Sequence, residues 1–275
     1  MKTNNKYDIP RQRKEELSDL AEFIADEHFP DSAIQPDVIV KRNNITHSIA
    51  DYGRYFDGIL QYKNGCFHMF FNTKRIQNIY SAKGRFTVAH ELGHYYIEEH
   101  RIALKRNLAP SHPSFIDFSS DIQVELEADF FASSLLIPKT RLLKDIRKWH
   151  FSMALINELK DKYNVSLTAM LLKYISIGNH PIMIVASENA KIKWFKYSDD
   201  FPFTYINATA YFKVPALTVA GDIFYKNSIV DNSDEIVYAE DWFSIWKNED
   251  KGREFYEHCI YSAKNKFVLS IIWEK

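Results

Sequence analysis

The sequence predicts an α+β protein in which a mainly helical part with a small sheet precedes a smaller, β-rich part. In the first part, apolar residues recur every three or four positions, as on one face of a helix. The run Gly178-Asn179-His180-Pro181 then interrupts the chain. Beyond it, β-branched and aromatic residues gather in short segments separated by turn residues. We therefore predict two domains, at residues 1–178 and 180–275.

The elements of the first part follow from the same patterns. Residues 59–72 alternate as two strands, and Lys63, Asn64 and Gly65 form the turn between them. Outside the two segments discussed below, the helical patterns fall at residues 12–27, 36–42, 139–149, 152–163 and 166–176. The segment "LAPSHPSFIDFSS" has two prolines and several serines, which predicts a loop that could border a substrate cleft.

Two hairpins are predicted in the second part. The segments "PIMIVAS" and "KIKWFKY" flank a Glu-Asn turn, and "REFYEHCIYS" and "KFVLSIIWEK" flank Ala263–Asn265. The many aromatic residues supply a core in the simplest interpretation. A pocket or interface that senses a signal or docks a substrate remains an alternative, because no motif distinguishes the two.

Composition excludes several classes of protein. The 35 basic and 36 acidic residues nearly cancel, so no strong field for nucleic acid or membrane is expected from the whole molecule. The first residues include no apolar signal segment, and no apolar run is long enough to cross a bilayer. Cys66 and Cys259 form no paired motif, which indicates a reducing compartment. We expect a cytoplasmic protein with no membrane partner.

The segment "RFTVAHELGHYYIEEHR", residues 85–101, predicts a metal site on a helix. His90 and His94 are four positions apart, so both imidazoles lie on one helical face and can bind the same zinc ion. Glu91 lies a third of a turn away, outside the set of ligands but within reach of a water molecule. This H-E-x-x-H arrangement is typical of metallopeptidases, and it gives Glu91 the role of catalytic base.

The third ligand is not expected to be His100. A metzincin has a glycine that breaks the helix before its third histidine, and Ile97 occupies that position here. A β-branched residue does not readily adopt the positive φ of such a break, so the helix should run on. His100 would then point away from the ligand face and lie on the surface.

A second helix, "DIQVELEADFFASSLLIP" at residues 121–138, offers a better third ligand. Glu125 and Asp129 are four positions apart and share a face. Glu125 can therefore bind the zinc, while Asp129 can hydrogen-bond a ligand histidine and fix its orientation. Glu127 points about 200° from Glu125 and is expected to face solvent.

Together, "RFTVAHELGH" and "EADFFASSLLIP" resemble the ImmA/IrrE family of metallo-endopeptidases, over residues 37–178. The segments "YFDGIL" and "FHMFFNT" are similar to the small sheet that precedes the active-site helix in that family. The resemblance implies a zincin-like catalytic domain with His90, His94 and Glu125 as zinc ligands and Glu91 as catalytic base. It also implies site-specific cleavage of a helix-turn-helix transcriptional repressor during a stress response, with zinc or, in vitro, manganese as the metal.

Residues 152–176 also resemble a helix-turn-helix, with a turn through Asn164 and Ser166 as N-cap of the second helix. Basic residues outnumber acidic ones around it, as a DNA reader requires. The preferred interpretation is a packing element, because leucines and a valine supply an apolar face. The alternative to an enzyme is thus a non-catalytic zinc-containing regulator that binds DNA or a partner protein. Glu91 favours the enzyme, since a structural zinc site needs no base.

Overall fold

The computed structural model describes residues 9–108, 123–207, 212–226, 228 and 233–275. These residues form two compact units. One takes in the described residues up to Asp145 together with Ile156–Met170, and the other takes in Ile146–Leu155 and Leu171–Lys275. The fold is α+β, as predicted: helices and a three-stranded sheet come first, and a five-stranded antiparallel sheet follows.

Each predicted helical segment of the first part is helical, with ends shifted by a few residues, but residues 85–101 form two helices instead of one, and α3 was not predicted. Before the metal motif lie α1 (Arg11–His28), α2 (Pro36–Arg42) and α3 (Thr73–Ile76). The motif and the segment after it form α4 (Ala82–Tyr96), α5 (Glu98–Lys105) and α6 (Gln123–Leu136). The last helices of this part are α7 (Lys139–Ile146), α8 (Met153–Tyr163) and α9 (Leu167–Ile177).

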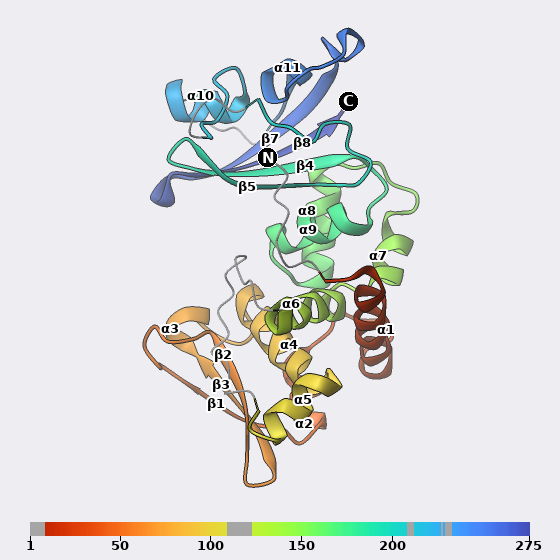
Figure 1. Ribbon diagram of the computed structural model, residues 1–275, viewed down its shortest axis with the longest axis vertical. Helices are drawn as coiled ribbons and strands as arrows, with labels where there is room; N and C mark the ends of the chain where they lie inside the picture. Colours follow the sequence, from red (N-terminus) through yellow and green to blue (C-terminus); the bar gives the residue numbers. More distant parts are fainter. Residues whose placement is uncertain (1–8, 109–122, 208–211, 227, 229–232) are drawn as a thin grey trace. The chain divides into compact units, whose positions relative to one another are not determined.

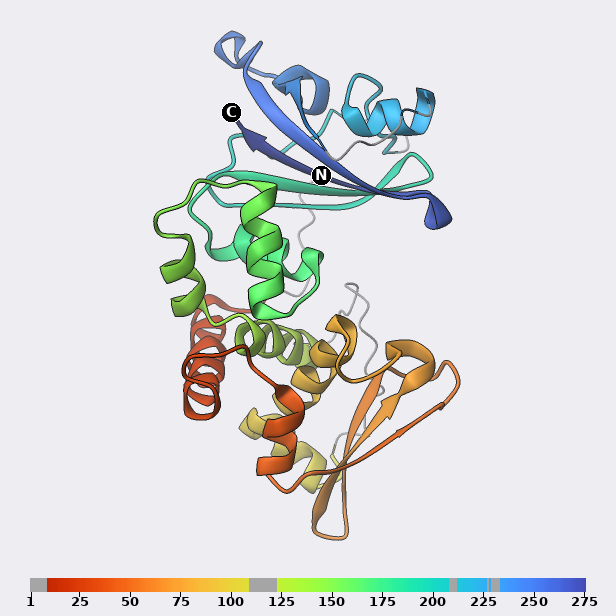
Figure 2. The same ribbon diagram turned by 180° about the vertical axis from the view of Figure 1, so that it is seen from behind.

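The small sheet has the order β1-β3-β2 and lies beside α4 (Figures 1 and 2). β2 (Gly58–Lys63) and β3 (Cys66–Asn72) form the predicted hairpin. Its turn places Asn64 and Gly65 at positive φ, which Asn-Gly sequences adopt readily. β1 (Thr46–Ala50) was not predicted, because it is short and largely polar, and it is a strand only through its parallel pairing with β3. β2 is thus an edge strand that packs against α4.

Close packing of α4 on α6 brings the two halves of the metal motif together. The small residue Gly93 lets the helices approach, since a Cβ there would lie 3.2 Å from the backbone of Ala128. Val88 and Leu92 of α4 and Phe131 of α6 are fully buried near this contact. A larger residue at position 93 would push the helices apart and separate the side chains that meet between them.

The second sheet has the order β5-β4-β8-β7-β6. The two predicted hairpins are β4 (Ile182–Glu188) with β5 (Lys191–Tyr197), and β7 (Glu254–Ser262) with β8 (Phe267–Glu274). The sequence patterns did not predict β6 (Asp234–Tyr238), α10 (Val219–Lys226) or α11 (Ala239–Trp242), which are short. Both helices lie over one face of the sheet (Figure 1). Trp242, Phe243 and Phe255 are at the centre of the core between them.

A buried carboxylate ties these helices to the sheet. Glu257 of β7 accepts hydrogen bonds from the backbone N–H groups of Val219 and Ala220 at the start of α10, at 2.9 and 3.1 Å. It also accepts one from the indole N–H of Trp242 in α11, at 2.8 Å. Burial raises the pKa of Glu257, although these N–H donors act in the opposite direction.

The helix-turn-helix-like pair is formed by α8 and α9, and Ser166 caps α9 through the N–H of Ala169. Its packing role is supported by burial: Leu155, Leu159, Val165 and Leu171 are all buried. Within α9, Ser176 is exposed, the other residues are buried or half-buried, and even Lys173 is buried. A DNA-reading helix needs exposed polar side chains, so this surface is poor for that purpose. None of the described helices is both long and apolar enough to span a membrane.

Candidate metal centre

Helix α4 places two histidines on one buried face. The helix starts at Ser81, whose hydroxyl accepts a hydrogen bond from the N–H of Gly84. His90 and His94 lie two and three turns further on, and both are buried. Their Nε2 atoms are 3.0 Å apart, so both nitrogens point at the same small space.

Glu125 of α6 completes a triangle of ligand atoms. Its Oε2 lies 3.2 Å from Nε2 of His90, and its Oε1 lies 3.5 Å from Nε2 of His94. Ligand atoms about 2.0–2.1 Å from a tetrahedral zinc would lie about 3.4 Å from each other. The three separations therefore fit one metal ion, and this buried cluster of His90, His94 and Glu125 can hold it.

Asp129 lies behind the first histidine. Its Oδ1 is 2.8 Å from Nδ1 of His90, the nitrogen on the far side of the ring from the cluster. Burial lowers the pKa of His90, but hydrogen bonds with Asp129 and Glu125, together with nearby charges that include Glu91, outweigh it and raise the pKa to about 10. The carboxylates that surround this ring therefore attract positive charge, whether a proton or a metal ion carries it.

Glu91 lies beside the cluster and outside the ligand triangle. Its side chain is buried, and the start of β2 packs against it. A Cβ at Gly58 would lie 2.8 Å from Oε1 of Glu91 and 2.6 Å from the methyl of Thr87. Glycine at this position therefore lets the edge strand pass directly over the carboxylate.

The prediction that the helix continues past Ile97 and leaves His100 on the surface is wrong. Ile97 has φ −68° and ψ 114°, an extended conformation that breaks the helix without a positive φ. α5 then starts in a new direction, and His100 is buried with its ring centroid 5.3 Å from that of His94. It is still not part of the triangle, since its Nε2 lies 3.5 Å from Oε2 of Glu127.

The prediction that Glu127 faces solvent is also wrong. Arg13 of α1 donates to its Oε2 from Nε and Nη2, at 3.0 and 2.7 Å, and the side chain is buried. Burial raises the pKa of Glu127, but the hydrogen bonds from Arg13 and Gln123 outweigh it and lower the pKa. Glu127 therefore serves as an ion-pair partner on a face of α6 different from that of Glu125.

Of the two wrong predictions, one had a local signal in the sequence and the other had none. Glu98 and Glu99 occupy the first turn of α5, and acidic residues are common at helix starts, so the break at Ile97 was detectable. Arg13 had no local signal, because it lies 114 residues from Glu127. The loop predicted at residues 108–120, with His112, lies outside the described residues apart from Leu108.

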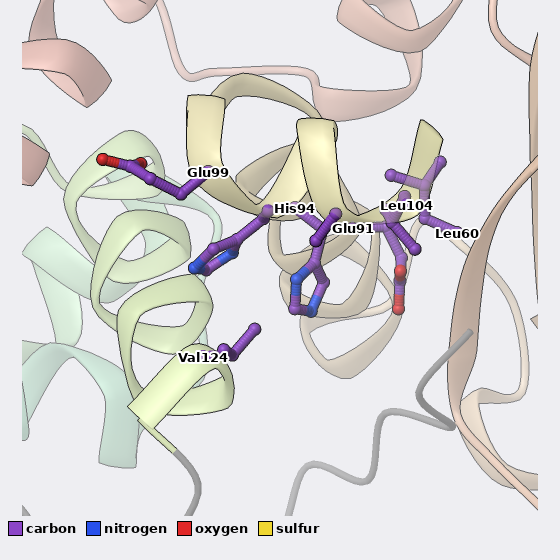
Figure 3. A pocket seen from close by; sticks show the side chains of 8 residues that line it. Leu60, Glu91, His94, Glu99, Leu104 and Val124 are labelled. Carbon is purple, nitrogen blue, oxygen red and sulfur yellow. The ribbon is translucent and has the colours of Figure 1, made fainter. Parts of the chain in front are cut away.

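A cavity of about 140 Å³ opens beside the cluster and is bordered by Glu91 and His94. Figure 3 shows these two side chains leaving α4 toward it, with Val124 of α6 and Leu60 of β2 around the same space. The candidate centre thus has a buried ligand triangle, a carboxylate beside it and an adjoining space large enough for a ligand.

Residues 81–173 match the family model Peptidase_M78, described as IrrE N-terminal-like domain. This match confirms the predicted ImmA/IrrE resemblance over residues 81–173.

Among solved structures, a Mycobacterium tuberculosis transcriptional regulator is similar to this chain, with a TM-score of 0.52 at 12% sequence identity. The similarity covers 95% of this chain and 82% of that one. At this identity it shows a shared fold. No curated protein matches the sequence.

Proposed function

We propose that this protein is a zinc-dependent endopeptidase that makes a site-specific cut in a regulatory protein, most simply a helix-turn-helix transcriptional repressor. The observation that carries the proposal is the buried triangle of His90, His94 and Glu125 with Glu91 one helical position from the first ligand. Three protein ligands leave a fourth position of a tetrahedral metal open, which is typical of catalytic zinc and not of structural zinc.

A bound zinc ion would supply Lewis acidity, which polarises a peptide carbonyl and lowers the pKa of water toward neutrality. The Glu91 carboxylate would take the proton of the attacking water and pass it to the leaving amine. Asp129 would hold Nδ1 of His90 and so keep Nε2 directed at the metal. Manganese can replace zinc in vitro in this proposal, because imidazole and carboxylate also bind it.

The edge strand β2 supports binding of an extended polypeptide. Among the described residues, β2 pairs with β3 on one side and with no strand on the other, and its first residue, Gly58, packs against Glu91. A substrate strand that added to the other side would gain backbone hydrogen bonds and run past the proposed base. Binding by strand addition requires an unfolded or loop segment in the substrate. Folded proteins that lack such a segment would therefore not be cleaved.

The repressor as substrate rests on the family match and on the resemblance stated above. The similar solved structure is a transcriptional regulator, which is compatible with a role in gene control in the cytoplasm. In this proposal the second part of the chain, residues 180–275, docks the substrate or senses the activating signal. Such docking would restrict cleavage to one partner.

The test uses the full chain in two forms. Glu91→Gln, loaded with zinc, should retain the partner that the wild type releases after cleavage, because the variant keeps the ligands and loses the base. The captured protein is then mixed with the zinc-loaded wild type, and mass spectrometry identifies the new termini. One cut in a captured regulator is expected. Broad digestion of unrelated proteins such as casein would contradict a site-specific role.

The alternative of a non-catalytic regulator is favoured by one observation, the helix pair α8–α9 in a chain whose fold resembles a transcriptional regulator. It predicts zinc-independent binding of DNA or a partner, with no new termini in the partner. The capture experiment separates the two proposals, since only the peptidase changes the mass of what it binds.

A further inference from the structure

The cavity beside the candidate metal centre is lined by residues of four elements, β2, α4, α5 and α6, and is hereafter called the side pocket. Its apolar lining is Leu60 of β2, Ala103 and Leu104 of α5, and Val124 of α6. Figure 3 shows Leu60 and Leu104 near Glu91, with Val124 on the side of His94. The side pocket therefore adjoins both the proposed base and a proposed metal ligand.

The break at Ile97 shapes this pocket. It turns α5 back toward β2, so that the half-buried Ala103 and Leu104 face the space next to α4. A chain of contacts holds the wall in place: the ring of His100 packs on His94, Glu127 lies 3.5 Å from His100, and Arg13 binds Glu127. Lys105, at the end of α5, also lies over the rings of Tyr62 and Phe67.

The volume and the apolar lining of the side pocket indicate which kind of side chain it can hold. A cavity of about 150 Å³ lined by apolar side chains holds a benzene ring, and the side pocket has about 140 Å³. Glu99 borders it, but its carboxylate is 3.1 Å from Nη2 of Arg13, so this charge is already paired. The space thus fits one leucine, methionine or phenylalanine side chain.

The side pocket lies along the path of a substrate strand that pairs with the edge of β2. A strand that adds to the edge of β2 has side chains that alternate between the two faces of the sheet. Leu60 is two residues from Gly58, which packs on Glu91, so a side chain of such a strand reaches the pocket within a residue or two of the reacting carbonyl.

We propose that the side pocket is the specificity pocket for a medium-sized apolar side chain of a residue that flanks the cleaved bond. This inference rests on the proposed peptidase function for the identity of that bond. Binding of the side chain itself depends on the pocket alone.

Binding can be measured without catalysis. The zinc-loaded full chain, with ¹³C-labelled alanine and leucine methyl groups, is titrated with N-acetyl-leucinamide and with N-acetyl-glycinamide. The leucine compound should shift the methyl signals of Ala103 and Leu104, and the glycine compound should bind about tenfold more weakly or worse, because it lacks the side chain. Equal binding of the two amides, or shifts that map away from these methyl groups, would overturn the assignment.

Two matched variants localise the effect. Ala103→Phe fills the pocket and should abolish the leucinamide shifts, while Ile102→Phe introduces the same side chain at the exposed neighbouring position and should leave them unchanged. Leu104→Ala widens the pocket and should favour a tryptophan amide over leucinamide, a change that misfolding would not produce. Leucinamide binding by Ala103→Phe at wild-type affinity would refute the proposal.

Cleavage of the captured partner gives the second readout. New termini beside leucine, methionine or phenylalanine support the pocket, and a cut flanked only by charged residues or glycine contradicts it. If leucinamide binds and no partner is cut, the proposed peptidase function is contradicted, while binding of an apolar side chain in the side pocket is supported. If a partner is cut and leucinamide does not bind, the pocket fails and the peptidase function remains.

Discussion

Oδ1 of Asp129 lies 2.8 Å from Nδ1 of His90, on the side of the imidazole opposite the ligand cluster. The two residues are 39 positions apart and come from the packed helices α4 and α6. A hydrogen bond in this place fixes the ring and leaves Nε2 as the nitrogen that faces His94 and Glu125. The orientation of one proposed ligand is therefore set by a residue that does not touch the metal position.

This contact predicts a metal-affinity effect of Asp129→Asn without loss of the fold. The amide keeps the size of the carboxylate but no longer favours a positive charge on the ring, and loss of such a partner costs about 10–100-fold in metal affinity. Competition with a chromophoric chelator measures it. Unchanged zinc affinity in a correctly folded variant would show that the hydrogen bond does not tune the site.

Metal binding should release about one proton near neutral pH. The pKa of His90 in the metal-free protein is raised to about 10, so the ring is protonated at pH 7 and must lose that proton to bind a metal. Zinc affinity should therefore fall as the pH is lowered. Calorimetry in two buffers of different ionisation enthalpy counts the protons, and a count of zero would mean that His90 is already neutral.

The same raised pKa has a consequence for folding. The folded value lies above the unfolded value of 6.5, so the protonated ring stabilises the metal-free fold at low pH. This contribution is complete below about pH 6.5 and is lost as the pH rises toward 10. The difference in melting temperature between the metal-free wild type and its His90→Ala variant should accordingly shrink from pH 6 to pH 10.

Glu125→Gln and Glu127→Gln should affect different properties, zinc binding in the first variant and the free energy of unfolding in the second. Glu125 is in the ligand triangle, so its substitution should weaken zinc binding strongly. Glu127 binds Arg13, so its substitution should leave one zinc bound and lower the free energy of unfolding by about 1–3 kcal/mol. Zinc analysis and denaturant unfolding of both variants test this, and the reverse ranking would exchange their roles.

His100→Ala should retain its zinc. The ring packs on His94 but its Nε2 faces Glu127, so the variant loses packing in the pocket wall and no proposed ligand. If the variant lost its zinc but kept the helix content of the wild type, His100 and not Glu125 would be the third metal ligand.

Helical periodicity was sufficient to predict which side chains share a face. The intervals from His90 to His94 and from Glu125 to Asp129 predicted two faces that the structure brings together. Periodicity did not predict which other side chains are buried. Glu127 is buried because Arg13 of α1, 114 residues away in the sequence, covers and neutralises it. His100 is buried because an extended Ile97 turns the chain, and that turn needs no unusual residue.

In the second part of the chain, strand patterns were enough to predict the two hairpins, whose strands pair locally in sequence. The carboxylate that organises its helices was not predicted. Alternation places Glu257 on the same face of β7 as the buried Phe255 and Cys259, but it does not identify the donors, which come from segments about 15 and 37 residues away. Such long-range polar contacts have no local signature.

The most direct test of the central claim is the rate at which zinc-loaded Glu91→Gln cleaves the partner, measured against the wild type at equal metal occupancy in single-turnover experiments. The account predicts one zinc in both proteins and a rate about 10²–10⁴-fold lower in the variant, the usual contribution of a general base. Equal rates at equal zinc content would contradict it, because the metal-binding triangle would then act without the carboxylate that lies beside it.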